Sequence, residues 1–117
     1  MPPIKVASNP VSFEELKKII HLDYGELVKA VVDIEKNIIA FGGEMHADEE
    51  KLLLEQGSKQ TNLWGINLYP DQFGTDEFIE FNSMINLRPS QGNRSRGVDD
   101  EEIQKRIVEV VSRLISK

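Results

Sequence analysis

One short segment of the sequence, running from Arg88 to Gly97, has a composition suited to holding an anion. It contains no acidic residue and no large apolar residue. Arginine carries a planar fork of N–H donors that matches carboxylate and phosphate groups. Small neighbouring residues leave backbone N–H groups accessible. The members that we expect to contact an anion are Arg88, Ser90, Asn93, Arg94 and Arg96.

The residues that follow this segment leave two interpretations open. Asp99 to Glu102 form an acidic run that opens the last predicted helix. A helix N-terminus favours an anion, but these four acids would repel one. The arginines could instead pair with the acids and stitch the loop to the helix. The segment lacks the Gly-Lys-Ser/Thr ending of a P-loop, so it carries no nucleotide signature.

A second group of candidates alternates along the chain after a Gly-Gly pair. Glu44, His46 and Asp48 occupy every second position. In an extended segment their side chains would point the same way, an arrangement that suits a divalent metal. The spacing matches no established zinc motif. The alternative is that Asp48 caps the next helix while Glu44 and His46 are exposed loop residues.

Composition limits the classes of function. The chain has 117 residues, which fits a single domain, 1–117, and it has no cysteine, which excludes disulfides and thiol chemistry. A net charge of −6 makes nucleic-acid binding unlikely as a general activity. No apolar run approaches the ~20 residues of a membrane helix, and the first residues lack a signal-peptide pattern. We therefore expect a cytoplasmic protein without membrane contact.

The elements that must position these residues follow from periodicity and turn signals. Strands are predicted at 4–7, 27–34, 38–41, 63–69 and 77–87, and helices at 13–22, 48–56 and 99–116. The order β-α-β-β-α-β-β-α, with short hairpins, indicates an α+β fold built on a mainly antiparallel sheet of four to five strands with three helices. Asn37 is the turn residue most tolerant of positive φ.

The predicted sheet has an unusually polar side. If the three helices cover one face, the other face carries a set of polar residues: Asn67, Glu80, Asn82, Asn86 and Arg88. Lys29 and Asp33 are further candidates for this face. Asn and Glu are depleted in strands, so this face is either simply exposed, a ligand groove or a subunit interface. The Leu27 and Val31 side of the sheet is a candidate homodimer surface.

Three phrases of the sequence resemble a small family of uncharacterised prokaryotic proteins. They are Gly43–Glu50, Leu63–Pro70 and Arg88–Gly97. The resemblance extends from Val6 to the last helix and implies a short, single-domain cytoplasmic protein. The family is one of unknown function, so the resemblance implies no activity, cofactor or site residue.

Three hypotheses follow. The leading one is binding of an anionic small molecule or an acidic partner through residues 88–97, with Asn82 and Asn86 as the adjacent wall. The first alternative is a metal-assisted hydrolase or transferase that uses Glu44, His46 and Asp48. The second alternative is a homodimeric interaction protein with no ligand. The sequence leaves open whether the protein is an enzyme, and it specifies no cofactor.

Overall fold

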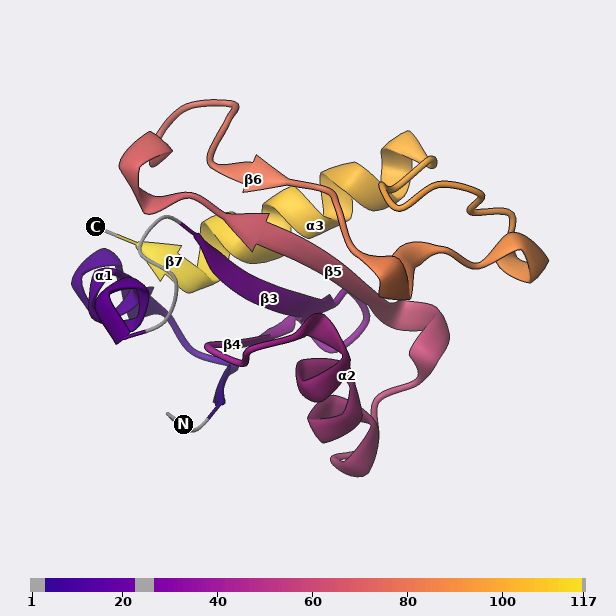
Figure 1. Cartoon of the computed structure of the whole chain (residues 1–117), viewed down its shortest axis with the longest axis horizontal. Coiled ribbons are helices and arrows are strands. Elements are labelled where there is room, and N and C mark those ends of the chain that lie inside the picture. Colours follow the sequence, from indigo (N-terminus) through magenta and orange to yellow (C-terminus); the bar gives the residue numbers. More distant parts are fainter. Residues whose placement is uncertain (1–3, 23–26, 117) are drawn as a thin grey trace.

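The computed structural model, which describes residues 4–22 and 27–116, confirms the α+β fold (Figure 1). The main sheet is antiparallel, with strand order β1-β4-β3-β5-β6. The strands of this sheet are β1 (Lys5–Ala7), β3 (Val28–Asp33), β4 (Ile38–Phe41), β5 (Leu63–Leu68) and β6 (Ile79–Glu80). The helices are α1 (Phe13–Leu22), α2 (His46–Glu55) and α3 (Glu101–Leu114). A small parallel pair joins β2 (Val11–Ser12) to β7 (Ile115–Ser116).

The β3–β4 hairpin forms as predicted. Asn37 lies in its turn with a φ of 57°, the conformation that asparagine tolerates better than most residues. The Asp33 side chain closes the turn, because its Oδ1 accepts from the backbone N–H groups of Glu35 and Lys36 at 2.9 Å each. Ser58 donates to Oδ2 of the same carboxylate at 2.7 Å and ties the turn to the end of α2.

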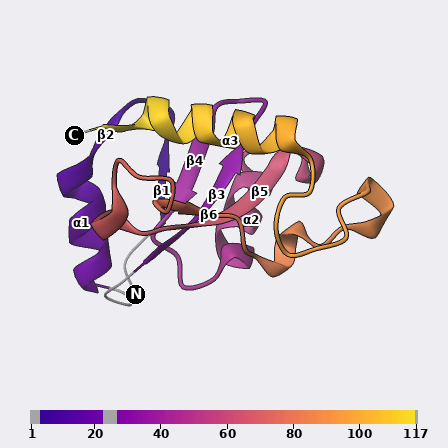
Figure 2. The same cartoon turned by 90° about the horizontal axis from the view of Figure 1, so that it is seen from above.

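The expectation that all three helices share one face of the sheet is wrong. Residues of α1 and α3 pack with Val28, Ala30 and Val32 in the larger core, whereas α2 packs on the other face, with Leu53 against Val31. Figure 2 shows α3 lying across the strands. The physical reason is that the second face of the sheet also carries apolar residues, among them Val31 on β3 and Ala40 on β4, so both faces of the central strands must be covered. Val31 is fully buried, and it offers no surface for a homodimer.

The predicted strand over 77–87 is also wrong, because only β6 forms. At Ser83 the chain leaves the sheet: its N–H donates to Arg96 O at 2.9 Å, and its Oγ accepts from Ile85 and starts a short 3-10 turn, Met84–Asn86. The side chain of Asn86 then takes the place of a paired strand. Its Oδ1 accepts from Gly65 N at 2.8 Å and its Nδ2 donates to Gly65 O at 2.9 Å.

Two helices begin at residues other than those predicted. The N-cap of α2 is Met45, not Asp48, and the helix begins at His46. The N-cap of α3 is Asp100, whose carboxylate accepts from Glu102 N at 2.8 Å. Asp99 therefore lies outside the helix, and its side chain contacts the preceding loop. None of the helices within 4–22 and 27–116 has the length and apolar character that crossing a membrane requires.

Candidate functional site

A groove of about 310 Å³ lies where the start of α2, the centre of the sheet and the segment after β6 meet. Its volume falls at the lower end of the range for small-molecule sites. Among the residues that the structure describes, the lining includes two cationic side chains and no acidic one. Its polar members are Lys29, His46, Asn67, Asn82, Ser83 and Arg96.

The floor of the groove is set by strand pairing. Lys29 on β3 is the register partner of Asn67 on β5, so the two side chains leave the same face of the sheet side by side. The Asn67 amide is fixed in orientation, because its Nδ2 donates to Glu80 Oε1 at 2.8 Å and to Asn82 O at 3.3 Å. Tyr69 also donates to Glu80, at 3.0 Å. The hydrogen bonds of Asn67 and Glu80 therefore fix the orientation of the side chains on the floor.

His46, the first residue of α2, lies against β5. Its Nε2 is 2.7 Å from Ile66 O, so this nitrogen carries the proton and donates. Burial lowers the pKa of His46 from 6.5, and the positive charges of Lys29 and Arg96 lower it further, against the opposing hydrogen bonds of Ile66 and Asn67. The imidazole is neutral at pH 7.

The N-terminus of α2 adds to the positive character of the groove. Met45, its N-cap, has an extended backbone and makes no side-chain capping hydrogen bond. Met45, His46 and Ala47 all line the groove. The positive end of the helix dipole is therefore directed at the same space as the two cations. Of the acids in the first turn, Asp48 is exposed, and Glu49 is buried with its carboxylate accepting from Gly43 N at 2.9 Å.

Arg96 reaches the groove from a loop whose backbone is fixed. Its carbonyl accepts from Ser83 N and from Asn86 Nδ2, both at 2.9 Å. The side chain itself is exposed. Of the three arginines expected to bind an anion, Arg96 is therefore the one that the fold places in the groove.

Asn93 organises the loop from inside. It is 4% exposed, and its Nδ2 donates to the carbonyls of Asn86, Ser95 and Gly97 at 2.7, 3.1 and 2.8 Å. Its Oδ1 accepts from Asp99 N at 2.8 Å. Asn86 is likewise fully buried and bonded to the strand. The structure therefore places both asparagines in the framework that supports the groove.

Arg88 also belongs to this framework. It is 9% exposed, and its guanidinium donates to three backbone carbonyls, those of Ile85, Gln60 and Leu63. Burial lowers its pKa, and the negative charge of Glu50 opposes that effect. Because its guanidinium donates to these backbone carbonyls, Arg88 anchors the loop to β5.

Hydrogen bonds join the loop to the acidic run, but the arginine side chains do not make them. Asp99 accepts from Arg94 N at 2.8 Å and from Ser95 Oγ at 2.6 Å, and these bonds lower its pKa. Within the described residues, no ion pair joins Arg94 or Arg96 to Asp99–Glu102. Arg94 and Ser90 are exposed and lie outside the groove lining.

The segment Glu44 to Asp48 is not extended, which corrects the geometry expected for a metal site. His46 and Asp48 lie in the first turn of α2, where residues two apart point in different directions. Glu44 and Asp48 are exposed and only His46 lines the groove. Over 4–22 and 27–116, no three His, Asp or Glu side chains are grouped so that they could hold a metal ion.

Sequence reasoning placed Lys29 and Asn67 on a polar face but did not assign them to the site. The signal was present: each interrupts a strand that is otherwise apolar, VKAVVD and LWGINL. Ser83 gave no signal, because its position depends on where β6 ends.

Fold and site together define a small α+β domain with a cationic groove beside the start of a helix. The chain belongs to a family described as "Protein of unknown function (DUF5674)", whose match covers residues 5–114. This confirms the expected membership of an uncharacterised family. No curated protein and no solved structure matches the chain.

Proposed function

We propose that the protein binds a small anionic molecule in the groove between α2, β3, β5 and the loop that carries Arg96. The observation that supports this most directly is the convergence of Lys29 and Arg96 on one groove, where the described lining residues include no acid. The site differs from the one expected from sequence, because the tip of the 88–97 segment lies outside it.

The charge distribution supports a local anion site in an acidic protein. The net charge is −6, so at long range the protein repels an anion and does not attract it. Within the groove, two cationic side chains and the start of α2 act over short distances, where neighbouring walls limit solvent screening. The protein therefore selects an anion by contact rather than by overall charge.

The polar lining gives each side chain a role. Arg96 supplies a planar fork suited to carboxylate or phosphate, and Lys29 supplies a compact charge from the floor of the groove. Asn82, a residue expected at the site from sequence, lies beside them in the groove. His46, whose pKa is lowered, contributes a polar surface that does not repel the anion or compete with it for Lys29 and Arg96, as an acid would.

The proposal is tested by isothermal titration calorimetry with inorganic phosphate, sulfate and short carboxylates at low ionic strength. We expect Lys29→Gln and Arg96→Gln each to weaken binding about tenfold or more, because each removes a direct charged contact. Arg94→Gln is the matched control: it makes the same change in net charge at an exposed residue outside the groove, and it should leave affinity within about twofold. Equal losses in Arg94→Gln and Arg96→Gln, or no binding of any anion, would refute the proposal.

A further inference from the structure

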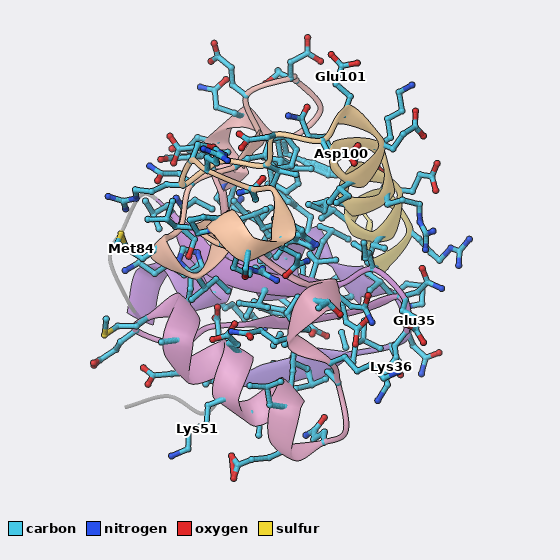
Figure 3. The ribbon with its side chains drawn as sticks, turned by 90° about the vertical axis from the view of Figure 1, so that its right-hand side faces the viewer. Glu35, Lys36, Lys51, Met84, Asp100 and Glu101 are labelled. Carbon is cyan, nitrogen blue, oxygen red and sulfur yellow. The ribbon has the colours of Figure 1, made fainter. Side chains whose placement is uncertain are left out.

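The rim of the groove carries the two most exposed large apolar side chains in the described part of the chain. Met84 is 63% exposed and Met45 is 58% exposed. They come from different elements, Met45 from the N-cap of α2 and Met84 from the 3-10 turn after β6, and both line the groove. Figure 3 shows Met84 projecting outward from the ribbon. Two apolar side chains therefore flank a polar, cationic floor.

The choice of residue at Met45 is informative. The N-cap position favours Ser, Thr, Asp or Asn, whose side chains accept from the first N–H groups of the helix. Met45 makes no such bond, so α2 forgoes a stabilising contact at the point where the helix meets the groove. An apolar side chain at this position stabilises neither the helix end nor the core, because it is exposed. A ligand contact accounts for both facts.

Methionine is well suited to such a contact. It is unbranched, flexible and polarisable, and it packs against aromatic rings and alkyl chains of varied shape. Covering the exposed parts of Met45 and Met84 would remove apolar surface from water, which is favourable. An inorganic anion could contact Lys29 and Arg96 but could not cover the two methionines.

We infer that the ligand is an organic anion: a carboxylate or phosphate group attached to an apolar body, aromatic or alkyl. The anionic group lies between Lys29 and Arg96, and the apolar body is held between Met45 and Met84. This inference rests on the proposed anion-binding function and specifies the class of molecule. The groove volume of about 310 Å³ suits a molecule the size of an aryl phosphate.

The test compares matched pairs of ligands by calorimetry: inorganic phosphate with phenyl phosphate, and acetate with phenylacetate. The organic member with the ring should bind the native protein about tenfold more tightly in each pair. In the double variant Met45→Ala/Met84→Ala that preference should fall to about twofold or less, while affinity for inorganic phosphate is unchanged, because alanine adds no capping oxygen at the start of α2. Leu54→Ala is the control, because Leu54 is 41% exposed and lies outside the groove lining.

The outcomes separate the two proposals. Equal affinity for phosphate and phenyl phosphate in the native protein overturns the organic-anion inference and leaves the anion site standing. A preference that survives in the double variant, or a loss that affects both ligands equally, also overturns the inference. Absence of binding by every anion in the panel overturns both proposals together. Circular dichroism of the variants checks that the fold is intact, and exposed positions such as these two are expected to tolerate alanine.

Discussion

The guanidinium of Arg88 lies over the indole ring of Trp64, with its central carbon 4.4 Å from the ring centroid. Trp64 is 2% exposed, and it lies in the larger core of the sheet. A cation over an aromatic face is attracted by the ring's quadrupole, and here the same cation also donates to backbone carbonyls around it. The contact fixes the segment after β6 to the sheet, and Arg96 reaches the groove from that fixed segment.

Replacing Arg88 by lysine should therefore destabilise the protein while retaining its charge. Lysine has no planar fork and cannot serve the carbonyls of Ile85, Gln60 and Leu63 together. We expect a loss of about 2–3 kcal/mol in the free energy of unfolding, measured by urea denaturation. Arg94→Lys, at an exposed position, should change it by less than about 0.5 kcal/mol. Identical transition midpoints for the two variants would show that Arg88 is not an anchor.

Substitution of Asn93 should also destabilise the protein, and it should weaken anion binding at the same time. Asn93→Ala removes one amide that serves three carbonyls and one N–H group, which we expect to cost about 2–3 kcal/mol. Asn93→Asp, nearly the same size, would place a carboxylate against those carbonyls and should cost more. Both changes should weaken anion binding by releasing Arg96. Denaturation and calorimetry on the same samples measure the two effects, and an Asn93→Asp variant as stable as the native protein would contradict this account.

The parts of the fold that the sequence predicted are those fixed by local pattern. The β3–β4 hairpin follows from alternation and the Asn37 turn, and α1 follows from helical periodicity. The strand expected over 77–87 failed for a non-local reason. Alternation continues past Glu80, but the side chain of Asn86 bonds the edge of β5 at Gly65 and replaces a strand there. No local pattern reports that exchange.

The candidate site was predicted in pieces. His46, Asn82 and Arg96 were each named from sequence, but in two separate hypotheses. Their meeting point depends on the pairing of β3 with β5 and on α2 covering the second face of the sheet, both of which are long-range contacts. Lys29 and Asn67 become site residues only once that register is known. Conversely, Arg88 and Asn93 have the composition of ligand contacts but are buried in the framework.

Gly65 lies so close to two groove residues, Ser83 and His46, that it leaves no room for a side chain. A Cβ at this residue would lie 2.6 Å from both Cβ and Oγ of Ser83 and 3.2 Å from Cδ2 of His46. Gly65→Ala should therefore destabilise the fold by about 1–3 kcal/mol and displace the groove wall. In a double-mutant cycle, Ser83→Gly should relieve part of this cost, so the two changes should be less than additive. Strict additivity would mean that the collision is relieved elsewhere.

The low pKa of His46 makes stability depend on pH in a defined direction. Its pKa in the folded protein lies below 6.5, chiefly through burial, so the unfolded chain binds a proton more readily than the native one. The contribution of His46 to the free energy of unfolding is complete above about pH 6.5. It is lost as the pH falls from 6.5 toward the pKa of His46 in the folded protein. The lowered carboxyl pKa values, of Asp99 and Glu15, lie below 4.5, so their contribution is lost at lower pH.

The free energy of unfolding should therefore decrease as the pH is lowered from 7 through 6, and His46→Gln should flatten that part of the curve. Glutamine does not titrate, and its amide N–H can still donate toward Ile66 O, so the variant isolates the charge from the contact. Urea denaturation at intervals of about half a pH unit measures the slope, which reports the difference in bound protons. His21 is retained in both proteins, so the difference between their curves belongs to His46. A variant that keeps the native slope would assign the pH dependence to another group.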